Sequence, residues 1–116
     1  MRVLIVEDDA LIALDMAGLV EDLGHEVMGP AAEAETAIVI ARNERPDIAL
    51  VDIRLAGKAD GGELAGWLYR DLGVRSLFVS GSITEAFREA MADIQPVGFL
   101  GKPITFRNLG EALRTL

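Results

Sequence analysis

Hydrophobic residues occur along this chain in short runs separated by longer stretches with helical spacing. The short runs span residues 3–6, 26–28, 48–51, 76–79 and 97–100, and most are rich in β-branched or large apolar side chains. Each is followed by acidic, hydroxyl-bearing or glycine residues. Such runs are typical of strands that a parallel sheet buries on both faces. The pattern therefore predicts five strands.

After each run, apolar residues recur every three or four positions, which is the spacing of one helix face. The five stripes are Ile12, Met16, Leu19 and Leu23; Ala34, Ala37, Ile38 and Ala41; Leu64, Leu68 and Leu72; Phe87, Ala90, Met91 and Ile94; and Phe106, Leu109, Leu113 and Leu116. Strands that alternate with helices form parallel β-α-β units with right-handed crossovers. We therefore predict an α/β fold, a doubly wound five-stranded parallel sheet with helices on both faces.

Length and composition further restrict the class of protein and the partners it can have. The 116 residues fit one domain, residues 1–116, and 51% hydrophobic residues supply a packed core rather than a disordered chain. A formal net charge of −8 argues against nucleic acid or an anionic membrane as a direct partner. The absence of cysteine excludes disulfides and thiolate metal sites and agrees with a cytoplasmic location.

Polar side chains follow four of the predicted strands. They are Glu7, Asp8 and Asp9 after the first, Asp52 after the third, Ser80 after the fourth and Lys102 after the fifth. The carboxyl ends of parallel strands meet at one edge of the sheet, where ligands bind. If the first and third strands are neighbours, Glu7 or Asp8 converges with Asp52. Carboxylates about 4 Å apart repel by roughly 4 kcal/mol at an effective dielectric of ~20, so the cluster needs a cation or a shared proton.

An all-oxygen cluster favours a hard cation. Mg²⁺ fits better than Ca²⁺, because few protein oxygens converge and water can complete the octahedron. A carboxylate facing such an ion is a candidate nucleophile toward a phosphoryl group, with Lys102 and Ser80 as candidate partners of its oxygens. Asp9 is better placed to cap the following helix.

With these motifs in order, the sequence resembles the receiver domain of bacterial two-component response regulators. The matching motifs are Val6-Glu7-Asp8-Asp9, Val51-Asp52, Val79-Ser80-Gly81 and Lys102-Pro103, and the resemblance covers residues 2–116. Each motif alone is weak, but four in order on five strand-helix units are specific. The resemblance implies a flavodoxin-like (βα)5 fold with sheet order 2-1-3-4-5 and a cis Lys102–Pro103 bond.

The resemblance also implies a role for each residue at the metal site. Glu7 and Asp8 match the acid pair that holds Mg²⁺, and Asp52 matches the phosphoacceptor. The backbone carbonyl of Arg54 would be the third protein ligand. On this reading Mg²⁺ is the only cofactor.

The function that the resemblance implies is a phosphorylation-dependent signalling switch of a phosphorelay. Asp52 would take its phosphoryl group from a sensor histidine kinase, a phosphotransfer protein or a small phosphodonor. Lys102 and Ser80 would contact that group, and Ser80 and Phe99 would form the switch. The change would reach the surface of the fourth helix, fifth strand and fifth helix, through which the domain could dimerise or contact a downstream protein or an attached output domain. The chain would catalyse only its own phosphorylation and dephosphorylation.

The loop after Asp52 departs from the family pattern. Residues 54–61 lack the usual Met-Pro pair and form a slightly longer loop, which bears on the loop's rigidity rather than on the chemistry. Two other functions stay open: an unphosphorylated docking module on the same fold, and a phosphatase-type enzyme with an aspartyl nucleophile. Such enzymes typically carry a second acid at the position of Arg54, and a docking module would have lost an acid or Lys102.

Overall fold

A parallel five-stranded sheet organises the molecule. Its strands are β1 (Arg2–Val6), β2 (Glu26–Ala31), β3 (Ile48–Asp52), β4 (Arg75–Ser80) and β5 (Gly98–Gly101). The structure is a computed structural model that describes residues 1–54 and 60–116. The strand order is β2-β1-β3-β4-β5, so β1 and β3 are neighbours and the predicted sheet is confirmed.

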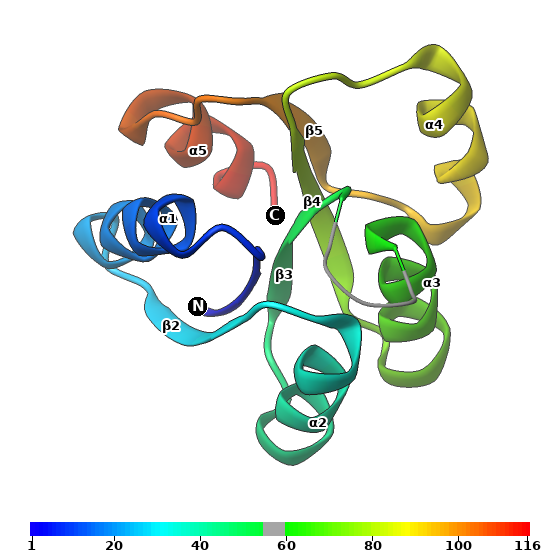
Figure 1. The fold of residues 1–116 in the computed structure, drawn as a ribbon, viewed down its shortest axis with the longest axis horizontal. Helices are drawn as coiled ribbons and strands as arrows, with labels where there is room; N and C mark the ends of the chain where they lie inside the picture. The colour runs from blue at the N-terminus through cyan, green and yellow to red at the C-terminus, as the bar shows by residue number, and fades with distance from the viewer. Residues whose placement is uncertain (55–59) are drawn as a thin grey trace.

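Helices cover both faces of this sheet (Figure 1). They are α1 (Ala10–Asp22), α2 (Ala34–Glu44), α3 (Gly61–Leu72), α4 (Glu85–Ala90) and α5 (Phe106–Leu113), with a 3₁₀ turn, η1 (Ala92–Ile94). Helices α1 and α5 pack on one face, and α2, α3 and α4 lie on the other. Within the two described ranges, no helix combines the length and hydrophobicity that a membrane crossing needs.

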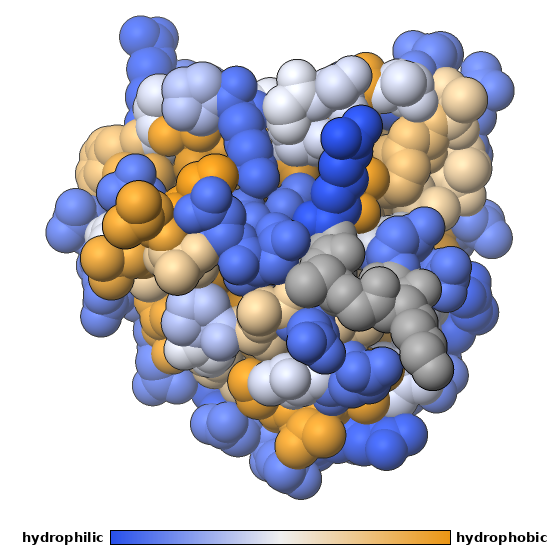
Figure 2. Space-filling view, in the orientation of Figure 1, coloured by the Kyte–Doolittle hydropathy of each residue, from blue (hydrophilic) through white to orange (hydrophobic). Residues whose placement is uncertain are grey.

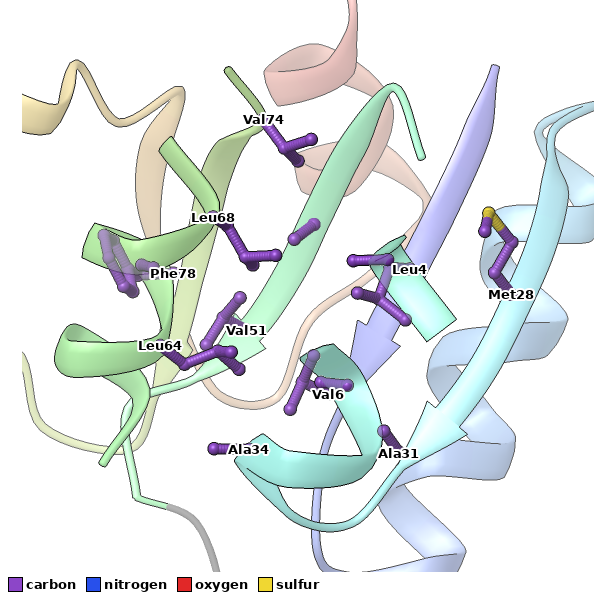
Figure 3. Close-up of a cluster of buried hydrophobic side chains, with 14 of the residues drawn as sticks. Leu4, Val6, Met28, Ala31, Ala34, Val51, Leu64, Leu68, Val74 and Phe78 are labelled. Atoms are coloured by element: carbon purple, nitrogen blue, oxygen red, sulfur yellow. The ribbon is translucent and has the colours of Figure 1, made fainter. Parts of the chain in front are cut away.

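The alternation of side chains along each strand builds one apolar cluster on each face. On β1, Leu4 and Val6 join the cluster beneath α2 and α3, whereas Val3 and Ile5 join the cluster beneath α1 and α5. Figure 3 shows the first cluster, in which side chains from β1 and β3 meet those of α3. Burying each large apolar side chain contributes about 1.5–3 kcal/mol, so the two clusters hold the strand ends, and the polar residues that follow them, in fixed positions.

The second strand is longer than its sequence pattern indicates. We expected it to stop at Met28, before Gly29-Pro30, but it continues to Ala31. It lies at the edge of the sheet beside β1, and its register with β1 shifts between Leu4 and Val6. An edge strand tolerates a proline because one side of its backbone has no partner in the sheet. The Gly29–Pro30 bond is cis, and so is the Lys102–Pro103 bond that the resemblance implied.

The last two helices are shorter than predicted. The stripe from Phe87 to Ile94 is divided between α4, which ends at Ala90, and η1, which ends before Gln95 at φ +49°. The turn still directs Ile94 inward, where it is 3% exposed. Helix α5 ends at Leu113, so the prediction that Leu116 belongs to its apolar stripe is wrong; that side chain is half exposed.

The segment after β3 joins the sheet edge to α3. Residues 55–59, on which the prediction of a longer loop rests, lie outside the described residues. On either side of them, the backbone N–H of Gly61 donates to the carbonyl of Ile53 at 3.0 Å. Asp60 caps α3, its Oδ1 accepting from the backbone N–H of Glu63 at 2.8 Å. The start of α3 is therefore fixed directly against the end of β3.

Candidate functional site

Two acids and one lysine from three separate segments meet at the carboxyl edge of the sheet. Glu7 directly follows β1, Asp52 ends β3, and Lys102 follows β5. Nζ of Lys102 lies 2.8 Å from Oε1 of Glu7 and 3.4 Å from Oδ2 of Asp52. The side chains of Glu7 and Asp52 are 0% and 6% exposed. Because buried carboxylates need a nearby positive charge, Lys102 is their internal counter-cation.

Backbone amides orient both carboxylates. Oε2 of Glu7 accepts from the N–H of Asp9 at 3.2 Å, and Oδ1 of Asp52 accepts from the N–H of Arg54 at 3.1 Å. In each case the other oxygen faces Lys102. Among residues 1–54 and 60–116, the fully buried Oε1 of Glu7 has that ammonium nearby but no aligned hydrogen-bond donor. This oxygen is therefore stabilised by charge and has a lone pair available to a cation.

The acidic cluster has the composition of a site for a hard divalent cation. Carboxylate oxygens of Glu7, Asp8 and Asp52 lie within 4.8 Å of one another. Asp9 is engaged elsewhere, as predicted: its Oδ1 caps α1 by accepting from the N–H groups of Leu11 and Ile12. Three carboxylate donors, two of them on buried side chains, fit Mg²⁺, which prefers a few carboxylates and completes its shell with water.

Burial and neighbouring charges shift the pKa values of Asp8 and Lys102. Partial burial, followed by interaction with Glu7, raises the pKa of Asp8 above its ordinary value of 3.8. Burial by itself would lower the pKa of Lys102, but its contact with Glu7 and the negative charges of Asp52 and Glu7 outweigh burial, and the pKa is raised. Lys102 therefore remains an ammonium throughout the physiological range, whereas Asp8 holds its proton more tightly than a free aspartate.

A cavity of about 350 Å³ opens over these groups. Its lining comes from the ends of β1, β3, β4 and β5: Glu7, Asp8, Asp9, Ile12, Asp52, Arg54, Ser80, Gly81, Ser82 and Lys102. Figure 2 shows hydrophilic residues gathered over the middle of this side of the molecule. All predicted site residues except Phe99 line this one cavity, which is wide enough for a phosphoryl group and a metal ion.

Ser80 lies in this cavity, but its hydroxyl is held locally. Oγ of Ser80 donates to the carbonyl of Ser82 at 3.1 Å and accepts from the N–H of Ser82 at 3.2 Å. The side chain is buried, at 5% exposure. Rotation about χ1 would be needed before the hydroxyl could serve a group bound at Asp52.

Phe99 lies apart from the cavity, on β5, in an aromatic cluster. Its ring stacks on Phe78 at 5.5 Å between centroids and meets the edge of Phe87 at 6.2 Å. The guanidinium of Arg88 lies 4.7 Å from the centroid of the Phe99 ring. Sequence reasoning missed the contacts of Phe87 and Arg88. The apolar stripe indicated only that Phe87 faces inward, not which ring it meets.

The chain belongs to the response regulator receiver domain family, whose sequence model matches residues 3–114. It is 30% identical over 116 residues to the transcriptional regulatory protein PdtaR of Mycobacterium tuberculosis, covering 97% of this chain and 54% of that protein. It is 39% identical over 113 residues to the phyllosphere-induced regulator PhyR of Methylorubrum extorquens, covering 97% and 42%. The chain thus spans about half the length of these curated relatives.

Solved structures give the same family and fold. The signal receiver domain of a modulated diguanylate cyclase from Desulfovibrio desulfuricans superposes with a TM-score of 0.89 at 35% identity, over 98% of this chain and 90% of that one. A CheY-like response regulator receiver domain from Methanospirillum hungatei gives 0.87 at 28% identity, over the same shares of the two chains. Family membership places the chain among the signalling domains of two-component systems.

Proposed function

We propose that this receiver domain is a phosphorylation-dependent switch in which Asp52 accepts a phosphoryl group. The donor is the phosphohistidine of a sensor histidine kinase or phosphotransfer protein, or a small molecule such as acetyl phosphate. The observation that carries the proposal is the convergence of Glu7, Asp8 and Asp52 around one cavity, with Lys102 within 3.4 Å of Asp52.

The chain's own groups suit an in-line transfer. A carboxylate oxygen of Asp52 attacks the phosphorus of the donor, a phosphorus–oxygen bond forms, and the donor's bond to phosphorus breaks with its electron pair leaving on the donor. The N–H of Arg54 holds Oδ1 of Asp52, which leaves Oδ2, beside Lys102, as the attacking atom. The ammonium of Lys102 then pairs with a phosphoryl oxygen.

Glu7, Asp8 and Asp52, with the backbone carbonyl of Arg54, are the groups that would hold Mg²⁺. When bound, Mg²⁺ supplies positive charge that offsets the charge on the transferring oxygens. Ser80 then exchanges its hydrogen bonds with Ser82 for one to a phosphoryl oxygen.

The output of the switch is a change in the surface of α4, β5 and α5. Rotation of Ser80 leaves space that the Phe99 ring repacks to fill, and this biases the surface between two arrangements. A downstream protein, an attached output domain or a second receiver reads that surface. The net charge of −8 favours protein partners over direct contact with nucleic acid.

Incubation with acetyl phosphate tests this function. The purified chain is treated with and without Mg²⁺ and its intact mass is measured. We expect one phosphoryl group per chain with Mg²⁺ and a loss of labelling after chelation. Asp15→Asn, on the exposed part of α1, is the control and should label normally. Labelling that is the same with and without Mg²⁺ would contradict the proposal. So would the absence of labelling by both acetyl phosphate and a phosphohistidine donor.

A further inference from the structure

Helix α4 is fastened to the rest of the molecule by very few side chains. None of its six residues is buried. Its inward-facing ring, Phe87, makes an edge contact with Phe78 of β4 at 5.1 Å and with Phe99 of β5 at 6.2 Å. Phe78 itself is fully buried in the sheet. The position of α4 is therefore set largely by where the Phe87 ring sits.

Arg88, the next residue of α4, reinforces this attachment. Its guanidinium lies 4.7 Å from the centroid of Phe99, on a ring that also stacks on Phe78. A cation over an aromatic face is attracted by the negative face of the ring, so this contact stabilises the position of α4. Movement of the Phe99 ring would therefore break two contacts that hold α4, the edge contact with Phe87 and the cation contact with Arg88.

Phe87 also lies close to the start of α3, the helix that follows the Asp52 segment. A Cβ atom on Gly62, at the start of α3, would come within 3.3 Å of Cε1 of Phe87. A Cβ atom on the preceding Gly61 would overlap the backbone carbonyl oxygen of Asp52. These two glycines place the backbone of α3 in close contact with the phosphoacceptor on one side and with Phe87 on the other.

The space between α4 and α3 is only partly filled. A groove of about 450 Å³ runs between α3 and α4, with Gly62, Gly66, Phe87 and Met91 among its lining residues. Figure 1 shows α4 at the periphery of the molecule, joined to β4 and β5 by connecting segments. The groove means that the Phe87 ring is packed on only part of its surface.

We propose that Phe87 and Arg88 are positioning residues that couple α4 to the site by two routes, through Phe99 on β5 and through Gly61-Gly62 at the start of α3. This inference rests on the proposed function for the signal that reaches Phe99, whereas the contacts of Phe87 and Arg88 are those described above. Release of Phe87 and Arg88 from Phe99 would loosen α4 as a unit. The output would then be a change in the order of α4 as well as in the shape of its surface.

Hydrogen exchange in the unphosphorylated chain tests the coupling directly. The variants are Phe87→Leu, which keeps an apolar side chain without the ring, and Arg88→Gln, which removes the charge. The control is Arg107→Gln on α5, where the side chain is 89% exposed and pairs with Glu111 of the same helix. We expect amide exchange in residues 85–94 to rise about three- to tenfold in both variants, with no change in α2 and no effect of the control.

A double variant and the phosphorylated state complete the test. Arg88→Gln and Phe99→Leu should be non-additive in α4 exchange, because both remove the same contact. After labelling with acetyl phosphate and Mg²⁺, wild-type α4 should exchange faster, whereas Phe87→Leu should incorporate phosphate but show little further change. Unchanged α4 exchange in both unphosphorylated single variants would overturn the inference. Absence of phosphate incorporation in wild type would instead contradict the proposed function.

Discussion

The Nζ atom of Lys102 lies 2.8 Å from Oε1 of Glu7, a side chain that is fully buried. This ion pair joins the segment after the last strand to the segment after the first. Its distance is shorter than the 3.4 Å that separates Lys102 from Asp52. The lysine that would pair with the phosphoryl group is therefore first of all the counter-cation of Glu7.

Replacing this lysine should destabilise the metal-free domain. In Lys102→Ala, Glu7 and Asp52 are left buried without a positive charge. We expect a loss of about 2 kcal/mol in the free energy of unfolding, less than the ~3–5 kcal/mol of a fully buried pair because the ammonium is partly exposed. Urea denaturation measures this loss, with Arg107→Ala as the exposed control.

Mg²⁺ should compensate Lys102→Ala in part, because it supplies charge to the same carboxylates. The increase in melting temperature on adding Mg²⁺ is therefore expected to be larger in this variant than in wild type. A variant that no longer responds to Mg²⁺ would show that Lys102 is needed to form the metal site, contrary to the role assigned to it.

Neutralising Asp8 should have the opposite effect on the metal-free chain. The pKa of Asp8 is raised by burial and by Glu7, so its ionised form disfavours folding, and stability falls as the pH rises from 3.8 through the raised pKa. Asp8→Asn should remove that dependence and increase stability at pH 7 by about 0.5 kcal/mol or less, since the side chain is exposed. Thermal unfolding across pH 3–7 without Mg²⁺ measures both effects.

The same Asp8→Asn variant should weaken the response to Mg²⁺. Wild type gains roughly 0.4 kcal/mol when the Mg²⁺ concentration equals the dissociation constant, and the variant should need more Mg²⁺ for an equal gain. Destabilisation of metal-free Asp8→Asn at pH 7 would contradict the unfavourable charge assigned here.

Removing a buried hydroxyl should stabilise the fold. Ser76 on β4 is 1% exposed, and its Oγ has no hydrogen-bond partner in the part of the chain that the structure describes. Ser76→Ala deletes a desolvated polar atom without creating a large cavity, so the free energy of unfolding should rise by about 1 kcal/mol. Denaturation of this variant beside Ser82→Ala, at an exposed position, checks the prediction; equal effects would show that the Ser76 hydroxyl is not the cause.

Two glycine substitutions should act in opposite directions. Gly61→Ala places a Cβ against the carbonyl of Asp52, and we expect a loss of about 2–3 kcal/mol together with impaired phosphorylation. In Gly18→Ala, within α1, the new Cβ has nothing within 4 Å, so helix propensity should add up to ~1 kcal/mol. Urea denaturation and acetyl phosphate labelling of the two variants test this. If Gly61→Ala were as stable and as well labelled as wild type, the proposed steric contact between α3 and Asp52 would be wrong.

Much of this fold could be predicted because its signals are local. Strands that are buried on both faces occur in the sequence as continuous apolar runs, and the alternation of strands with helices predicts a parallel sheet. The polar residues after each run then fall at one edge by geometry, which is why Glu7, Asp52 and Lys102 could be assigned to a single site. The end of β2 was missed because Pro30 interrupts a central strand but not an edge strand.

Side-chain pairings could not be predicted in the same way. Whether Lys102 lies nearer to Glu7 or to Asp52 depends on differences of less than 1 Å that packing decides. The contact of Arg88 with Phe99 joins an exposed helix to a strand eleven residues later, and no spacing rule in the sequence encodes it. The unpartnered hydroxyl of Ser76 is likewise a property of the folded core.

We propose Asp52 as the residue that carries the phosphoryl group, and chemical mapping of the modified residue tests this directly. After treatment with acetyl phosphate and Mg²⁺, borohydride reduction converts the phosphorylated aspartate to homoserine, and peptide mass mapping locates it. We expect homoserine at position 52 in wild type and no labelling in Asp52→Asn. Homoserine at position 8 or 9, or full labelling of Asp52→Asn, would contradict it.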